Sequence, residues 1–263
     1  MPKPFNITLL TVLCVALSLL SKPLWADNNK VTVLMDDTYP PYMYKEHSQN
    51  KGLYPQLVAA IFEEAQIPAE IKTIPWKRAI ILSKESSRAI GGLYKNEKRL
   101  SIYDFSDPIY TEQLWVYTKP DSNFTFQQLS DLKGKRAALN LGWSYGAEFD
   151  KLRAEGVFTI EEYGDNHSNL IKLISLPRID YTLMDEVAAQ LIMTRHDLHQ
   201  KVKRISPPAI QNKAYIAFSK SSRQLKTLQA FNQALKRLRS SGKYQKIVED
   251  FLNHPSQNDI QEN

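Results

Sequence analysis

Apolar residues recur along the chain with two alternating spacings. The run 30–35 (KVTVLM) alternates and is rich in β-branched residues, which predicts a strand, and Leu53, Leu57 and Ile61 then follow at helical spacing. A strand at 70–74 (EIKTI), a helix that begins with Pro75 and a strand at 88–94 (RAIGGLY) continue the pattern. Such an alternation of strand and helix is typical of a mostly parallel sheet with helices packed against it.

The segment 36–44 (DDTYPPYMY) separates the first predicted strand from the first predicted helix. Its two prolines cannot donate to a strand ladder, and they hold the neighbouring aromatic residues on a stiff, extended backbone. We therefore expect this segment to be a loop.

A further strand is predicted at 113–119, and turn-forming residues at 119–125 (KPDSNFT) then separate a second α/β alternation from the first. Its predicted strands are 135–142, 158–164 and 178–185, and its predicted helices are 145–156, 168–176 and 186–195. A second break is expected at 205–213 (ISPPAIQNK), followed by a strand at 213–220 and two closing helices.

The closing segment is too short to form a domain, so it is expected to pack on the first α/β alternation. This predicts an α/β fold of two lobes, with residues 27–118 and 212–255 in the first lobe and residues 119–211 in the second. The chain would cross between the lobes twice, near Thr118 and near Pro208, and two crossings make a hinge beside a cleft. Residues 256–263 are a polar tail.

The first 26 residues have the layout of a secretory signal peptide. Lys3 precedes an apolar run from Ile7 to Leu20, and the segment ends at Ala26 before a polar stretch. We expect cleavage after Ala26 and a periplasmic mature protein; an uncleaved anchor is the alternative. Cys14, the one cysteine of the sequence, lies inside the expected signal, so the mature chain would have no disulfide.

The charge of the chain is moderate and dispersed. The formal net charge is +6, and removal of the expected signal, which carries two lysines and no acid, leaves +4. No long basic block and no nucleic-acid-binding motif occurs, so nucleic acid is not an expected partner.

The predicted strands end at side chains of complementary chemistry. An arginine is a planar donor for a carboxylate, an aspartate can hold an ammonium group, and aromatic rings form walls or bind cations through their faces. Ligands in α/β folds bind outside the carboxyl ends of the strands, so these residues predict a small zwitterionic or carboxylate ligand, an amino acid or a related carboxylate. The candidates are Tyr39, Trp76, Arg99, Ser144 and Asp185.

Each candidate also has a purely structural interpretation. Arg99 could pair with Asp104 or Asp107 in a surface loop, and Asp185 could cap the helix that follows it. Trp76 could be packing of the core or rim, and Trp143 could line the cleft or lie buried behind it. No metal site and no cofactor is expected, because no cluster of ligating side chains occurs.

Six segments in the same order resemble the bacterial periplasmic solute-binding proteins of the polar amino-acid type (family 3). They are DDTYPPYMY, PWKRA, GGLYKNEKRLSIYDFSDPIY, LKGKRAALNLGWSYG, RIDYTLMDEVAA and SGKYQKIVEDF, and the likeness runs from about Lys30 to Phe251. The resemblance implies the type II periplasmic-binding-protein fold, with a two-strand hinge. It also implies a monomer that delivers a small ligand to an ABC transporter permease.

The resemblance also implies roles for particular residues. Arg99 would grip the ligand carboxylate with help from Ser144, Asp185 would take the ammonium group, Tyr39 would stack on the ligand, and Trp76 would form a second wall. The segment GGLY departs from the small hydroxyl residues that are common in the family, so Gly92 and Tyr94 would shape the pocket differently. An acidic residue that is usual at the opening of the first helix is also missing.

Two other functions remain as alternatives at this point. A hydrolase or dehydratase on the same fold would need a positioned acid or base such as Glu97 or Asp185, and the sequence contains no nucleophile, histidine and acid set. A ligand sensor for a separate membrane receptor would use the same cleft. We expect a binding protein rather than an enzyme.

Overall fold

The computed structural model describes residues 30–253 of the chain. The expected signal peptide and the polar tail at 256–263 lie outside the described residues. No helix in the described part is long and apolar enough to cross a membrane. The division into two lobes at the expected boundaries stays a prediction.

Residues 31–253 form two groups of parallel strands that are joined by antiparallel pairs. In the first group β1 (Val31–Met35) pairs in parallel with β5 (Ala69–Thr73) and β6 (Ala89–Leu93). In the second group β9 (Arg136–Asn140) pairs in parallel with β10 (Thr159–Tyr163) and β11 (Tyr181–Asp185). The α/β fold that the sequence predicts is confirmed, and the strand pairing is mixed, because antiparallel pairs join the two parallel groups.

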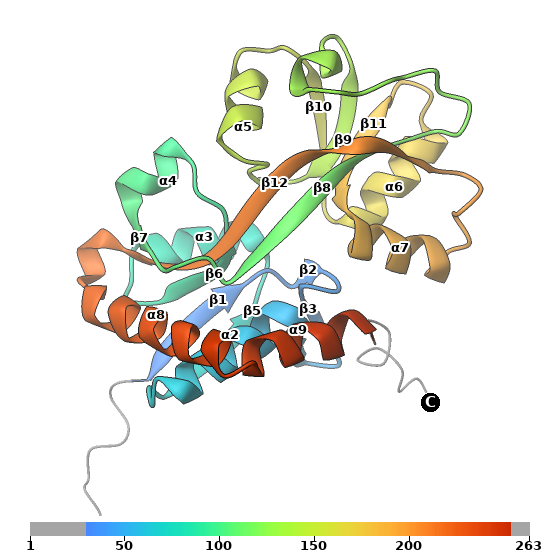
Figure 1. The fold of residues 1–263 in the computed structure, drawn as a ribbon. Helices are drawn as coiled ribbons and strands as arrows, with labels where there is room; N and C mark the ends of the chain where they lie inside the picture. The colour runs from blue at the N-terminus through green and yellow to red at the C-terminus, as the bar shows by residue number, and fades with distance from the viewer. Residues whose placement is uncertain (1–29, 254–263) are drawn as a thin grey trace, which may run out of the picture. The chain divides into compact units, whose positions relative to one another are not determined.

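Two long strands connect the groups. β8 (Tyr110–Thr118) pairs with β11, and β12 (Lys203–Ser219) pairs with β6 and with the short β7 (Tyr103–Phe105). β8 and β12 also pair with each other along most of their length, and Figure 1 shows them side by side between the two groups.

The break expected at 205–213 is wrong. β12 continues through this segment, and the two prolines lie where its register against β8 shifts between Ile205 and Ile210. Proline cannot donate a ladder hydrogen bond, so the strand passes Pro207 and Pro208 at an irregularity rather than ending there.

The loop expected at 36–44 is also partly wrong. β2 (Thr38–Tyr39) pairs with β3 (Met43–Glu46), and β3 pairs with β4 (Gln49–Lys51), so short antiparallel strands flank the two prolines. This small sheet fixes the backbone on either side of Pro40 and Pro41, which places Tyr39 and Tyr42 in the interior.

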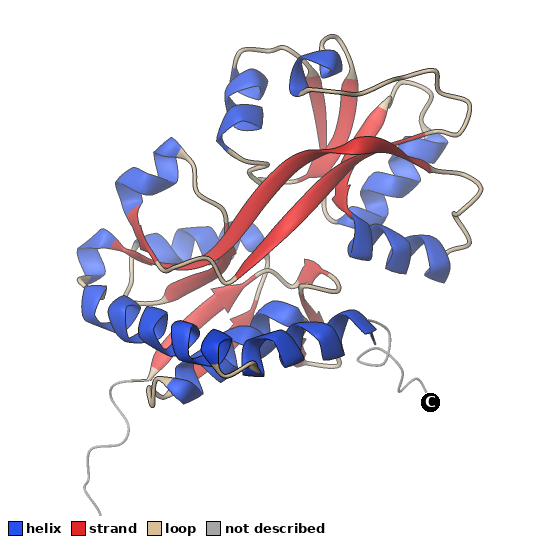
Figure 2. Ribbon diagram, in the orientation of Figure 1, coloured by secondary structure: helices blue, strands red, loops and turns tan. Residues whose placement is uncertain are grey.

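Helices cover the strands in both groups (Figure 2). The first group carries α2 (Leu53–Glu64), α3 (Trp76–Lys84), α4 (Glu97–Ile102), α8 (Leu225–Ser240) and α9 (Lys243–Asn253). The second carries α5 (Ala147–Ala154), α6 (Asn166–Ser175) and α7 (Glu186–Arg195), with a 3₁₀ turn at Leu129–Leu132. α8 and α9 both pack on α2, so the closing segment joins the first group as expected.

The helices bury the apolar faces that their spacing predicts. Leu228, Phe231 and Leu235 of α8 are buried, and Phe231 packs against Phe62 of α2 with ring centroids 5.0 Å apart. A second core lies among β8, β9, β11 and α5, where Phe149 packs on Phe158 at 4.6 Å. Burial of this kind supplies most of the favourable free energy of folding.

Candidate functional site

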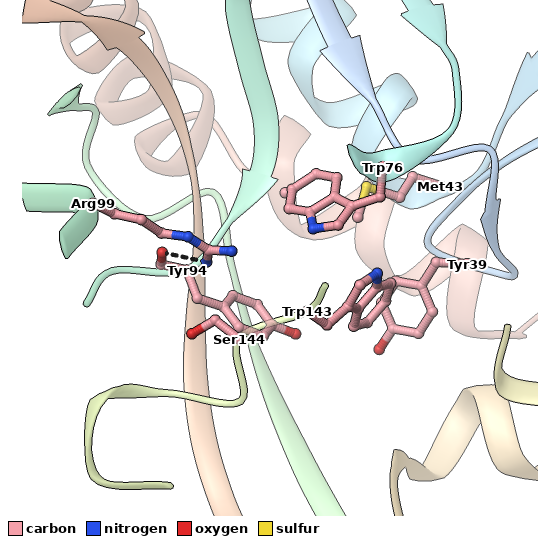
Figure 3. A pocket seen from close by; sticks show the side chains of 8 residues that line it. Tyr39, Met43, Trp76, Tyr94, Arg99, Trp143 and Ser144 are labelled. Atoms are coloured by element: carbon pink, nitrogen blue, oxygen red, sulfur yellow. Dashed lines mark hydrogen bonds between the residues drawn. The ribbon is translucent and has the colours of Figure 1, made fainter. Parts of the chain in front are cut away.

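A small cavity lies where residues from both groups of strands meet. It holds about 240 Å³ of empty space, including its open mouth. Its lining consists of Tyr39, Met43, Trp76, Gly92, Tyr94, Arg99, Trp143 and Ser144, and Figure 3 shows how these side chains face one another. Every candidate from the sequence therefore lines one cavity, except Asp185.

Arg99 lies in the short helix α4, which the sequence interpretation took for a loop. Asn96 caps the start of the helix, and its side-chain oxygen accepts a hydrogen bond from the Arg99 backbone N–H at 2.9 Å. The Arg99 side chain then turns back toward the cavity, where one terminal nitrogen donates to the carbonyl of Tyr94 at 2.9 Å (Figure 3).

The Arg99 guanidinium has little compensation from the protein. Among the described residues it makes no ion pair within 4 Å, and Asp104, one of the partners that the structural alternative named, pairs with Lys220 instead. Burial lowers the pKa of Arg99 to about 10, although the nearby Asp150 carboxylate opposes this shift. A half-buried cation with unused donors favours an anionic partner.

Ser144 follows β9, as the sequence predicts, but its hydroxyl already has an acceptor. It donates to Asp150 of α5, whose other carboxylate oxygen accepts the Tyr145 backbone N–H at 3.0 Å. The Asn96 amide donates to both, at 3.2 Å to Ser144 Oγ and 3.1 Å to Asp150 Oδ2. An internal carboxylate therefore occupies the hydroxyl and amide donors that a ligand carboxylate could use.

A larger space of about 680 Å³ adjoins the cavity. Arg99, Trp143 and Ser144 line both spaces, and the larger one is also lined by Lys84, Lys98 and Arg153 and by one carboxylate, Asp150. Basic side chains outnumber the acidic one beside Arg99, which favours an incoming anion.

Gly92 forms part of the cavity wall, and a residue with a side chain would not fit at this position. It has a φ of +75°, and a Cβ atom would lie 2.6 Å from the sulfur of Met43. Trp143 lines the cavity as well, and its Nε1 donates to Asp36 Oδ2 at 3.0 Å.

Asp36 is a residue that the sequence interpretation missed. It ends the first strand segment and is almost fully buried, and its Oδ1 accepts the Thr38 backbone N–H at 3.0 Å and the Thr38 hydroxyl at 2.9 Å. Burial raises the pKa of Asp36 to about 6. Asp36 directly follows a predicted strand, and this position could have identified it as a residue near the site.

Asp185 does not line the cavity. Its Oδ1 accepts the Val187 and Ala188 backbone N–H groups at 2.8 and 3.4 Å, so it caps α7 as the structural alternative expected. The same oxygen accepts the Tyr42 hydroxyl at 2.5 Å, which ties the second group of strands to the first. Burial raises the pKa of Asp185.

Glu112 of β8 accepts hydrogen bonds from three tyrosine hydroxyls, and two of these tyrosines line the cavity. Its Oε2 accepts the hydroxyls of Tyr39 and Tyr94 at 2.6 and 2.7 Å, and its Oε1 accepts the hydroxyl of Tyr54. Burial and the nearby Asp185 carboxylate raise the pKa of Glu112 to about 7, against the opposing effect of the tyrosine hydroxyls. Two of these tyrosines line the cavity, so Glu112 fixes its wall.

The sequence interpretation missed Glu112, although a signal was present. Glu112, Leu114 and Val116 alternate along β8, and all three are buried on the same face of the strand. An acidic residue in phase with buried apolar residues indicates a buried carboxylate that needs donors.

The described residues contain no group of three or more histidine, cysteine, aspartate or glutamate side chains that could hold a metal ion. The residues that line the cavity offer a ligand hydrogen bonds, charge and aromatic surface.

Comparisons with known proteins agree with this arrangement. The sequence profile of the bacterial extracellular solute-binding proteins, family 3, matches residues 31–254. The arginine-binding extracellular protein ArtP of Bacillus subtilis (strain 168) is 28% identical over 211 residues, which are 80% of either chain. The L-cystine-binding protein TcyJ of Escherichia coli (strain K12) is 26% identical over 236 residues, 86% of this chain and 84% of TcyJ.

Solved structures share the fold. An ancestral arginine-binding protein bound to arginine superposes with a TM-score of 0.71 at 22% identity, over 85% of this chain and 98% of that protein. The type II two-lobed fold that the sequence resemblance implied is therefore confirmed.

Proposed function

The chain belongs to the bacterial extracellular solute-binding proteins of family 3, and from this premise we propose that it captures an amino acid in the cavity beside Arg99. The captured ligand is delivered to an ABC transporter permease in the inner membrane. The mature protein acts as a periplasmic monomer after cleavage near Ala26, and it leaves its ligand chemically unchanged.

One observation carries the proposal. The Arg99 guanidinium faces the cavity with one hydrogen bond, to the carbonyl of Tyr94, and without a carboxylate partner within 4 Å in the described part of the chain. An arginine that is withdrawn from water and left without an anion is costly, and a ligand carboxylate would remove that cost through two parallel hydrogen bonds.

Acceptor atoms in the cavity wall support an ammonium group on the same ligand. Tyr39 and Tyr94 line the cavity and donate their hydroxyl hydrogens to Glu112. Their oxygens keep lone pairs that can accept a hydrogen bond from a ligand, which favours a positive group on the ligand as well as a negative one.

A ligand screen tests the proposal. Thermal unfolding of the mature protein is measured with each of the twenty L-amino acids, L-cystine and L-ornithine, and the hits are confirmed by isothermal titration calorimetry. At one hundred times its dissociation constant a ligand stabilises the protein by about 2.7 kcal/mol, which raises the midpoint by several degrees.

Arg99→Ala is expected to abolish the shift of the best ligand. Arg88→Ala is the matched control, because Arg88 is an exposed arginine outside the cavity lining. A panel in which no compound shifts the midpoint, or an Arg99→Ala protein that binds as tightly as the parent, contradicts the proposal.

A further inference from the structure

The hydroxyl groups that line the cavity have already committed their hydrogen atoms. Tyr39 and Tyr94 both donate to Glu112, and Ser144 donates to Asp150. A hydroxyl has one hydrogen to give, so these groups can offer a ligand only their lone pairs. The side-chain donors left for a ligand therefore belong to other residues of the lining.

Trp76 supplies one such donor. It is the first residue of α3, directly after Pro75, and its side chain lines the cavity while only 7% of the residue surface is exposed. Its indole nitrogen is buried and has no hydrogen-bond partner among the described residues. In Figure 3 this nitrogen faces the space that Tyr94 and Trp143 enclose, rather than the surrounding backbone.

A buried indole N–H without an acceptor is unusual in folded proteins and calls for an explanation. Trp143, which packs beside Trp76 with ring centroids 6.4 Å apart, gives the contrast. The Trp143 N–H donates to Asp36 at 3.0 Å and is satisfied by the protein itself. The Trp76 N–H has been left for a group that enters the cavity.

Arg99 supplies the second donor. One of its terminal nitrogens donates to Tyr94, and a guanidinium carries five N–H groups in a planar fork. Arg99 and Trp76 line the same small cavity from different helices, α4 and α3. An acceptor between them would satisfy both side chains.

We infer that Trp76 is a specificity-determining ligand contact, and that its indole N–H and the Arg99 guanidinium together bind the carboxylate of the ligand. This inference rests on the proposed function and deepens it, because it identifies the ligand carboxylate as the recognised group and Trp76 as a residue that binds it. In this arrangement Ser144 stays bound to Asp150, and Trp76 takes the place that the sequence resemblance gave to the Ser144 hydroxyl.

The arrangement discriminates between ligands that differ at one group. A carboxylate presents only acceptors to Arg99 and Trp76, whereas a carboxamide also presents an NH₂ group and carries no charge. An amino acid should therefore bind more tightly than its amide, and part of that preference should depend on the indole N–H.

The experiment uses three proteins and two sets of probes. The parent protein, Trp76→Phe and the control Trp115→Phe are titrated with the twenty L-amino acids and with their carboxamides. Phenylalanine keeps the aromatic wall and removes the N–H. Trp115 lies on β8 outside the cavity lining, where its ring packs under Arg204 at 4.1 Å.

For each amino acid that binds the parent protein, Trp76→Phe should weaken binding about tenfold or more, while affinity for its amide changes less than threefold. The Trp76 indole proton resonance of ¹⁵N-labelled protein, assigned by its loss in Trp76→Phe, should move downfield with the acid and much less with the amide. Trp115→Phe should bind both probes as the parent does.

The outcomes separate the two proposals. If no member of the panel binds, the proposed function fails and this inference fails with it. If amino acids bind but the Trp76 resonance stays in place, or Trp76→Phe weakens acid and amide equally, Trp76 serves as a wall or bonds a cavity water only. The inference is then overturned while the proposed function stands.

Discussion

Arg99 and Glu112 are charged residues near the same cavity, and their surroundings differ in one decisive respect. Glu112 is fully enclosed and receives three tyrosine hydroxyls, which satisfy both of its oxygens. The Arg99 side chain makes one hydrogen bond among the described residues, to Tyr94, and the guanidinium lines the cavity. Glu112, whose oxygens are all hydrogen-bonded, stabilises the fold, whereas Arg99 has donors available to a ligand. Variants of Glu112 should therefore lose stability, and variants of Arg99 should lose ligand affinity.

The largest effect on stability is expected from Glu112→Ala. It removes the acceptor of three buried hydroxyls and leaves a cavity, so the free energy of unfolding should fall by about 3 kcal/mol or more. Arg99→Met, which removes a cation that has few partners, should change the same quantity by less than about 1 kcal/mol. Urea unfolding followed by circular dichroism measures the free energy of unfolding of both variants. Equal losses would contradict the distinction between a structural Glu112 and a ligand-binding Arg99.

The next effect is a pH dependence that belongs to Glu112. Its pKa is raised to about 7 from an ordinary value of 4.5, so the folded protein holds a proton there that the unfolded chain releases. This contribution to stability is complete below pH 4.5 and is lost as the pH rises to about 7, which amounts to about 3 kcal/mol.

Glutamine does not titrate, so Glu112→Gln should remove the pH-dependent contribution of Glu112 to stability. The free energy of unfolding of the variant should therefore fall less than that of the parent between pH 4.5 and pH 8. Asp36, whose pKa is raised to about 6, contributes a slope of the same sign that both proteins retain. Parallel stability curves for parent and variant over this range would show that Glu112 does not titrate there.

The smallest effect concerns Tyr94, which belongs to both regions. Its hydroxyl donates to Glu112, and its carbonyl accepts from Arg99. Tyr94→Phe removes only the hydroxyl, so it should lower the free energy of unfolding by about 1 kcal/mol.

Ligand affinity in Tyr94→Phe should change less than about threefold, because the ring and the carbonyl that holds Arg99 both remain. Calorimetric titration with the best ligand of the screen measures this. A large loss of affinity would show that the two regions are not separable.

Much of the fold follows from the spacing of apolar residues. The regular helices and the parallel strands were predictable because each buries one face, as α8 does with Leu228, Phe231 and Leu235. Two of the errors arose where proline governed the interpretation, and a third is the short helix α4, which was taken for a loop. Local sequence does not show that β12 passes Pro207 and Pro208 at a shift of register, because that depends on the pairing partner β8.

The site was predictable where its residues follow strands, and less so where partners come from distant segments. Arg99, Trp76 and Ser144 were named from the sequence and line one cavity. The acceptor that occupies Ser144 is Asp150, and the donors that surround Glu112 come from three separate segments, β2, α2 and the residue after β6. Such contacts are set by tertiary structure, and a single sequence does not show them.

The most direct test of the account measures how strongly the protein prefers a carboxylate, with and without the arginine. The dissociation constants of the best-binding L-amino acid and of its carboxamide are determined by calorimetry for the parent protein and for Arg99→Met. The account predicts a preference of about one hundredfold for the acid in the parent, which is on the order of a buried charged pair, and in the variant only the smaller share, below about tenfold, that the Trp76 N–H supports. An equal preference in both proteins would contradict the claim that Arg99 is the residue that awaits the ligand.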